Sequence, residues 1–491
     1  MTELLYRGGI DAKTGTYRYP PMTTGQIADL ARARPGTLAP ADHVDLEAWY
    51  DLVKYSRALR DGKDPKDLAQ AGWGVIFAQT EEKTEDLKAA LRQLLDRRKE
   101  QAGALNSRYY REFTGEDGYR WIEKNGRRRG ETRREFLLRH GAHPADAADP
   151  EHVPYYLLIV GDPESIPYDF QYQLDVQYAV GRIWFKTLEE YERYACNVKE
   201  TEERRERQAS SRRISFWGTQ HAGDWLTDLS ATQLVEPLAQ WVKDCGGGWD
   251  VDTSIGAKAS KRRLAELFCG EGGPDLLFTA SHGVVLDPGH SQLEDVQGAL
   301  LCDNWPGPRS QDPLEGKHFF SAADLDGIER IHGLVTVQFA CHSAGSPSSS
   351  DPEVPDADRE KRVRTKVADH SFIARLPQRL LALGAQAFIG HVDSAWPWSI
   401  RWSGAAPRIE VFEDTLKRLL EGHPVGSAME LFGQRFASLS TELSGMLEDS
   451  WFNEPTDEDL ADVWTARNDA RNYVVVGDPA VRICHPVSEV T

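Results

Sequence analysis

Three features that would place a protein in a specialised class are missing from this sequence. Its six cysteines show neither paired nor metal-like spacing, which argues against a disulfide framework or a zinc site; they are Cys196, Cys245, Cys269, Cys302, Cys341 and Cys484. No apolar run has the length of a signal peptide or a membrane-spanning helix. The formal net charge of −19 argues against nucleic acid as a partner, because a phosphate binder needs a basic face. We therefore expect a cytoplasmic protein that binds neither membranes nor nucleic acid and needs no cofactor.

The length and the order of apolar patterns indicate an α/β protein of more than one domain. A chain of 491 residues exceeds one ordinary domain. We expect an N-terminal extension over residues 1–70, part of it an extended arm, a non-catalytic α/β subdomain over 71–208, and a larger α/β domain over 209–491.

The larger domain contains six buried strands that alternate with helices. This alternation predicts a mostly parallel sheet with helices on both faces. The strands are expected at Arg213–Trp217, Trp249–Ile255, Asp275–Ala280, Leu334–Ala340, Ala385–Gly390 and Tyr473–Val476. Between Val284 and Trp305 the pattern indicates a β-hairpin, and over Ala322–Ile331 it indicates a helix.

Two of these strands stop at residues that can do chemistry. The third strand ends at His282 and Gly283, and the fourth ends at Cys341. Because the carboxyl ends of neighbouring parallel strands face one crevice, a thiol and an imidazole are expected to meet there. A nucleophilic cysteine needs such a base, and it needs backbone N–H donors for the oxyanion, which Gly283 and Cys341 can supply. A structural cysteine and a turn histidine are the alternative. His342 diverges from its neighbour Cys341, and His391, with Asp393 nearby, is a weaker competing base.

The order strand-His-Gly and then strand-Ala-Cys resembles the caspase-like cysteine peptidases, the group of caspases, gingipains, clostripain and CHAT proteases. Further segments resemble the gingipain-type branch: residues 156–162, 175–183 and 390–396. The resemblance covers roughly residues 73–481 and implies a caspase-like six-stranded sheet preceded by a smaller α/β subdomain. It also implies that His282 is the general acid/base and Cys341 the nucleophile.

The resemblance also suggests how a substrate is read. Trp396 matches an aromatic residue that lines the S1 pocket of gingipains. Several family members prefer a basic P1 residue, and Asp224 or Asp228 could provide the acidic partner. Both acids could equally be helix N-terminal residues. Phe339 stands where clostripain-like members carry an acid, which leaves the P1 preference open.

A long polar segment over residues 346–370 follows the nucleophile directly. Its composition is that of a flexible loop, and in caspases the equivalent linker is cleaved during activation. We predict cleavage at its basic residues, Arg359, Lys361, Arg362, Arg364 and Lys366. A tolerated surface insertion is the alternative. Its acids, Asp351, Glu353, Asp356 and Asp358, could bind calcium but lack an EF-hand pattern.

These observations favour a cysteine endopeptidase that acts on protein substrates and is controlled by a partner, by an activating protease or by its own processing. The resemblance implies a role in a bacterial stress or defence pathway. The alternative hypothesis is a catalytically silent caspase-fold scaffold that binds protein partners.

Overall fold

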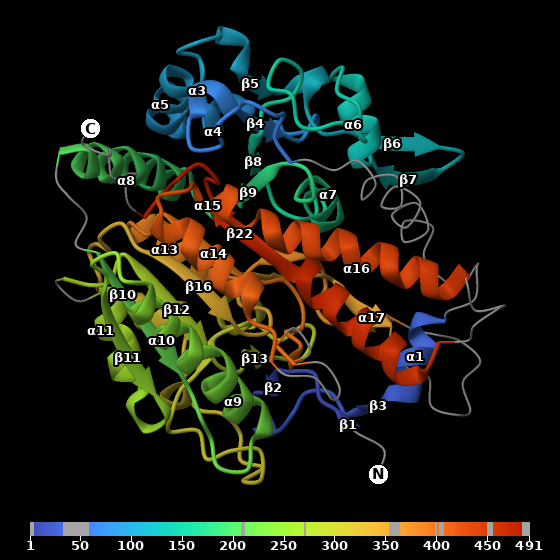
Figure 1. Ribbon diagram of the computed structural model, residues 1–491, viewed down its shortest axis with the longest axis vertical. Helices are drawn as coiled ribbons and strands as arrows, with labels where there is room; N and C mark the ends of the chain where they lie inside the picture. Colours follow the sequence, from blue (N-terminus) through green and yellow to red (C-terminus); the bar gives the residue numbers. More distant parts are fainter. Residues whose placement is uncertain are drawn as a thin grey trace.

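The computed structural model describes residues 4–32, 58–207, 212–269, 272–352, 364–397, 400–401, 407–448 and 455–483. A mixed α/β fold is built around one sheet of ten strands in the order β11-β10-β12-β16-β21-β22-β9-β8-β4-β5. The predicted α/β fold class is therefore confirmed. Figure 1 shows the two halves of this sheet, the β4–β9 part at the top and the β10–β16 part below.

The six predicted strands of the larger domain form one half of the sheet. They are β10 (Arg213–Gly218), β11 (Asp250–Ile255), β12 (Leu276–Ala280), β16 (Val335–Phe339), β21 (Ala387–His391) and β22 (Tyr473–Gly477). All pair in parallel except β22, which runs antiparallel to β21. The central strands β12, β16 and β21 are buried along their whole length, as expected where helices cover both faces.

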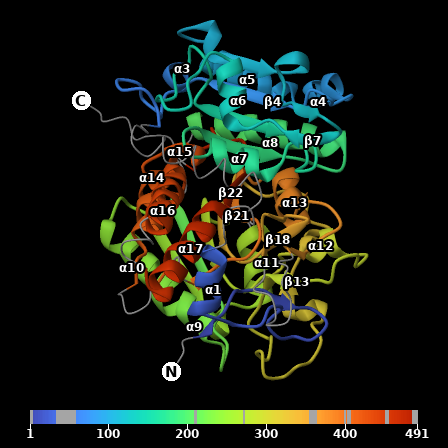
Figure 2. The ribbon, with the colours of Figure 1, turned by 90° about the vertical axis from the view of Figure 1, so that its right-hand side faces the viewer.

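Helices cover both sides of this half. Figure 2 shows α14 and α16 on one side of β21 and β22 and α13 on the other. The helices of this half include α9 (Trp225–Ser230), α10 (Glu236–Cys245), α11 (Lys261–Cys269), α13 (Arg375–Leu383), α14 (Glu410–Leu420), α16 (Glu430–Glu448) and α17 (Asp457–Asn472).

The smaller half continues the same sheet. Its strands are β4 (Trp73–Phe77), β5 (Tyr110–Phe113), β8 (Tyr156–Val160) and β9 (Ala179–Ile183), with helices α4 (Thr84–Ala90), α5 (Arg92–Ala102), α6 (Arg133–Arg139), α7 (Tyr168–Leu174) and α8 (Leu188–Arg207). The halves join where β22 pairs in parallel with β9, at Val476 and Arg182. Strand β22, the last one in the described part of the chain, thus links the two predicted domains into one sheet.

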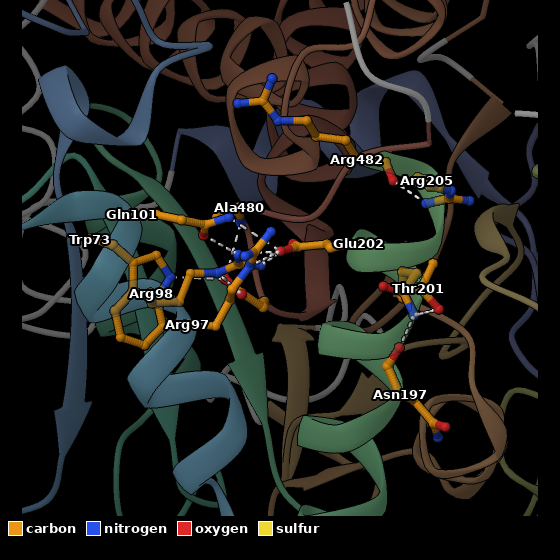
Figure 3. Close-up of polar contacts among 12 residues, drawn as sticks. Trp73, Arg97, Arg98, Gln101, Asn197, Thr201, Glu202, Arg205, Ala480 and Arg482 are labelled. Carbon is orange, nitrogen blue, oxygen red and sulfur yellow. Dashed lines mark hydrogen bonds and ion pairs between the residues drawn. The ribbon is translucent and has the colours of Figure 1, made fainter. Parts of the chain in front are cut away.

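A buried ion network strengthens this junction. Arg98 on α5 donates to Asp478, just after β22, at 2.7 Å. It also donates to Glu202 on α8 at 2.6 Å (Figure 3). The Arg98 side chain is 1% exposed. Because removing one partner of such a group leaves an uncompensated buried charge, the network fixes the end of β22 to the smaller half.

One local expectation is met with an addition, and one is wrong. Strand β13 (Val284–Val285) pairs in parallel with residues of the N-terminal extension, and residues 283–284 also pair antiparallel with residues 298–300, as expected of a hairpin, with helix α12 (Leu293–Val296) in the connection. The expected helix at Ala322–Ile331 is only a short 3-10 turn, Ala322–Leu325. Leu325 and Ile331 are buried in the main apolar core, and the turn packs on α13, so the apolar residues are covered without a regular helix and periodicity alone overestimated it.

The segment after the nucleophile is paired at both ends. Strands β17 (Gly345–Ser346) and β20 (Phe372–Ile373) pair, and so do β18 (Ser349–Pro352) and β19 (Arg364–Lys366). Backbone pairing needs no apolar run, which explains why composition predicted a loop throughout. Arg359, Lys361 and Arg362 lie outside the described residues. Arg364 begins β19, and the exposed Lys366 forms an ion pair with Asp369 at 2.6 Å.

The first part of the N-terminal extension lies across the larger half. Strands β1 (Leu4–Leu5) and β3 (Met22–Thr23) pair with each other, so residues 4–23 form a closed excursion that we call the N-terminal arm. Helix α1 (Thr24–Ala31) follows and packs on α17 (Figures 1 and 2). In the middle of the arm, β2 (Ile10–Asp11) pairs in parallel with β13. The expected extended arm is present.

Candidate active site

The two strands that end at chemically capable residues are neighbours. β12 and β16 pair in parallel, with Ala280 opposite Phe339. His282 and Cys341 each follow their strand by two residues, so both lie at the same edge of the sheet. Close backbone packing requires Gly283: a Cβ there would lie 1.9 Å from the carbonyl oxygen of Cys341.

The thiol of Cys341 is enclosed. Its residue is 2% exposed, and the N–H of Ala395 donates to Sγ at 3.1 Å. Burial raises the pKa of Cys341 to about 12, because its effect outweighs that of the hydrogen bond from Ala395, which lowers the pKa. In this conformation the thiol is therefore protonated at neutral pH.

His282 is oriented by a buried carboxylate. Its Nε2 lies 2.8 Å from Oδ2 of Asp224, and both side chains are almost fully buried. Burial alone would raise the pKa of Asp224, but the charge and hydrogen bond of His282, with hydrogen bonds from Tyr17 and Thr227, hold it well below its usual range. The ionised carboxylate accepts the Nε2 proton, so Nδ1 is the ring nitrogen that can accept a proton from the cleft whenever the imidazole is neutral.

Asp224 and Asp228 both lie at the N-terminal end of α9, which is one of the two positions that the sequence had left open. Asp224 is the residue before α9, yet its side chain makes no cap bond to that helix and instead contacts His282, Tyr17 and Thr227. Asp228 is exposed and accepts from the side chain of Gln220 at 2.7 Å. The structure assigns neither acid to a substrate pocket.

A small cavity lies next to the thiol. It is lined mainly by apolar residues: Gly8, Leu226, Thr227, Leu229, Ser230, Ser281, His282, Phe339, Cys341, Ala395, Pro397 and Ile400. No carboxylate is among these lining residues. Trp396, expected in the S1 wall, instead packs in an apolar cluster with Leu5 of the arm and Trp464 of α17, while its neighbours Ala395 and Pro397 line the cavity.

The competing histidines face away from this chemistry. His342 is fully buried, and its Nδ1 lies 2.9 Å from Ser346 Oγ. His391 is also fully buried, with Nε2 3.2 Å from Asp469. Burial lowers the pKa of His342 to about 4. Both side chains support the strand ends, and His282 is the imidazole that borders the cavity with Cys341.

Sequence reasoning missed the residues that cover the site. The arm crosses the cleft at Gly8 and Gly9, where a Cβ on Gly8 would lie 2.7 Å from Cys341 Sγ and 3.9 Å from His282 Nδ1. Tyr17 donates its hydroxyl to Asp224, and its ring meets that of His282 edge-on at 5.7 Å. The adjacent glycines were the available signal, because Gly-Gly marks a place where backbone can approach another group closely.

The described residues contain neither a metal-binding cluster nor a membrane-spanning helix. Of the acids considered for calcium, Glu353, Asp356 and Asp358 lie outside the described residues. Within the described ranges, no group of three or more His, Cys, Asp or Glu side chains could hold a metal ion. Among the helices described, none is long and apolar enough to cross a membrane.

Comparison with known proteins finds likenesses in fold. No family model matches the chain, and no curated protein matches its sequence. The solved structure of a protease is 14% identical with a TM-score of 0.47, covering 84% of this chain and 78% of the other. The Arg-specific cysteine proteinase gingipain R (RgpB) is 14% identical with a TM-score of 0.44, at 84% and 78% coverage. Separase of Saccharomyces cerevisiae, in complex with securin, is 9% identical with a TM-score of 0.29, covering 66% of this chain and 15% of that one. The neighbours gingipain R and separase are both caspase-like cysteine peptidases.

Proposed function

We propose that this protein is a cysteine endopeptidase in which Cys341 is the nucleophile and His282 the general acid/base. The observation that carries the proposal is the Asp224–His282 pair beside a buried thiol at the ends of two adjacent strands. A nucleophile, a base and a group that orients the base are the parts that acyl transfer requires.

The chemistry follows from these positions. Nδ1 of His282 takes the Cys341 proton as Sγ attacks the scissile carbonyl carbon, and the N–H groups of Gly283 and Cys341 stabilise the oxyanion. The imidazolium then protonates the leaving amine as the C–N bond breaks, which leaves a thioester on Cys341. Water, deprotonated by His282, attacks the thioester, and the acid product leaves as the thiol is regenerated. Asp224 acts through His282 as a positioning residue.

The cavity beside Cys341 is the proposed S1 pocket. Its lining of Leu226, Leu229 and Phe339, with the hydroxyls of Thr227 and Ser230, favours a neutral, small or apolar P1 residue. A basic P1 residue remains the prediction of the family resemblance. However, the described residues that line the cavity include no carboxylate that could pair with the guanidinium of a P1 arginine.

One element of control and one cellular role are also proposed. Cleavage between Arg359 and Lys366 by an activating protease or by the enzyme itself would cut the segment that follows the nucleophile. The described ends of this segment are held by the β17–β20 and β18–β19 pairs, so the fragments should stay together after the cut. A bacterial stress or defence role is proposed only on the family resemblance.

A cleavage assay tests the peptidase proposal. A peptide library is incubated with the native chain and with a Gly9→Val chain, because Gly8 and Gly9 lie across the thiol. Cys341→Ala and His282→Ala should each abolish cleavage, and the double variant should be no worse than either, because both residues serve one proton-transfer route. Cys302→Ala is the matched control, since Cys302 is equally buried and borders a different part of the core. Cleavage that survives in Cys341→Ala would leave the scaffold hypothesis as the better account.

A further inference from the structure

The N-terminal arm is hydrogen-bonded along the edge of the candidate active site. The N–H of Ile10 donates to the carbonyl of Gly283 at 3.0 Å, and the N–H of Ala12 donates to Val285 at 2.9 Å. On the other side of the thiol, the N–H of Gly8 donates to the carbonyl of Ala395 at 3.4 Å. The arm is therefore held as an extended peptide on both sides of Cys341, the way in which a cleft binds a strand-like substrate.

Only glycine fits where the arm crosses the thiol. A Cβ on Gly8 would stand 2.7 Å from Cys341 Sγ, and one on Gly9 would stand 2.8 Å from the Val285 side chain. Gly9 also has φ +109°, a conformation that other residues rarely adopt. The Gly8–Gly9 peptide thus occupies the space over Sγ that a scissile peptide would need.

The returning part of the arm holds the first part in place. The N–H of Arg18 donates to the carbonyl of Gly9 at 3.0 Å, and its guanidinium pairs with Asp287 at 2.6 Å and with Asp11. Next to Arg18, the hydroxyl of Tyr17 donates to Oδ1 of Asp224, while Nε2 of His282 is hydrogen-bonded to Oδ2 of the same carboxylate. The arm therefore engages the site's own positioning carboxylate.

Apolar contacts anchor the same segment. Ile10 is fully buried in a cluster with Val284, Leu301 and Trp305. Arg7, before the glycines, is also buried, and its guanidinium lies over the ring of Tyr19 at 3.8 Å. With the arm in place His282 is 4% exposed and Cys341 is 2% exposed, which leaves no room for a second peptide at the thiol.

From these contacts we propose that residues Tyr6–Asp11 are an internal pseudosubstrate, which fills the peptide groove with Gly8 in the position of the P1 residue and keeps the enzyme closed. The proposal rests on the proposed peptidase function and adds its regulation and a substrate class: extended chains with a very small residue at P1. Displacement of the arm, by a partner or by a substrate that competes for the groove, opens the site.

Alkylation of Cys341 tests the arm independently of hydrolysis. Iodoacetamide modification of Cys341 is followed by peptide mass spectrometry in the native chain and in Gly9→Val, whose side chain meets Val285 and cannot adopt the native φ. Gly445→Val is the matched control, because a Cβ at Gly445 meets nothing within 4 Å. We expect the rate at Cys341 to rise about tenfold or more in Gly9→Val and to stay unchanged in Gly445→Val.

A synthetic peptide of residues 4–12, added to Gly9→Val, should restore slow alkylation by refilling the groove. Tyr17→Phe, which removes only the hydroxyl that Asp224 accepts, should give a smaller increase and keeps the test valid if Gly9→Val does not fold. An unchanged alkylation rate in folded Gly9→Val or Tyr17→Phe would overturn the proposal, and so would a peptide that gives no protection. Faster alkylation of a chain that cleaves no peptide would support the arm and contradict the peptidase function. Full peptide cleavage by the native chain with the arm bound would support the peptidase function and contradict the role of the arm.

Discussion

Replacing Asp224 with asparagine should slow peptide cleavage without changing the fold. Asp224 accepts the Nε2 proton of His282 at 2.8 Å in a buried setting, and asparagine keeps the shape but loses the charge. A hydrogen bond to a charged group contributes about 1.5–3 kcal/mol. If it is lost only in the transition state, kcat falls by about 10- to 150-fold.

The effect should appear in kcat, with KM nearly constant. Asp224 touches His282 and not the cavity that we assign to the substrate, so ground-state binding has little reason to change. Assays use the Gly9→Val background, because Asp224 also accepts from Tyr17 and its substitution would loosen the arm. In the native background, release of the arm by Asp224→Asn would raise the rate of cleavage and mask the fall in kcat.

The matched control is Asp228→Asn. Asp228 lies four residues further along, is exposed, and accepts from Gln220. Its substitution should leave kcat unchanged within error. Equal activity of Asp224→Asn and Asp228→Asn would refute the positioning role, and a loss of discrimination for basic P1 residues in either variant would restore the sequence-based prediction.

Four further predictions concern specificity, reactivity, stability and processing. Ser230→Asp places a carboxylate in the apolar cavity and should create cleavage after arginine in a peptide library; no gain would show that the cavity is not S1. In the native chain iodoacetamide should modify the exposed Cys245 before Cys341, and the rate at Cys341 should rise only as the pH approaches about 12; rapid alkylation of Cys341 at pH 7 would contradict this. The unfolded chain loses the thiol proton near its ordinary pKa, whereas the folded chain keeps it until the raised pKa. The contribution of Cys341 to stability should therefore be complete below pH ~9 and fall between pH ~9 and ~12. Arg98→Ala should lower the free energy of unfolding by about 3–5 kcal/mol in urea titrations, because Asp478 and Glu202 lose their buried partner, whereas Arg207→Ala, in an exposed pair, should cost under about 1 kcal/mol. Replacing the five basic residues between Arg359 and Lys366 with glutamine should abolish any cut seen there on gels, and full activity of the uncut variant would show that processing is not required.

Local sequence patterns were enough to find the strands and the two reactive residues. Runs such as Leu276–Ala280 and Val335–Phe339 are buried on both faces, so they contain apolar and β-branched residues without alternation. Parallel pairing then places His282 and Cys341 at one edge, whatever the intervening loops do. The role of each residue in catalysis stays a prediction until it is tested.

The partners of those residues could not be found in the same way. Asp224 lies far from His282 in sequence, and its pattern is equally typical of a helix N-terminus; only packing of the loop before α9 against the end of β12 decides that its carboxylate faces the imidazole. Trp396 likewise follows its strand as expected, but the helices α1 and α17 decide that its ring joins their cluster. Side-chain direction at a loop depends on which surfaces are available to bury it, and those belong to distant elements.

The arm shows the same division most clearly. The sequence by itself determined that residues Gly8 and Gly9 have backbone freedom and no side chain, and that Ile10 is apolar. Only the tertiary structure decided that this segment lies over Cys341, because the β2–β13 pairing, the burial of Ile10 and the Tyr17–Asp224 bond join residues hundreds of positions apart. Contacts of that range carry no local periodicity, and their free energy exists only once the whole sheet has formed.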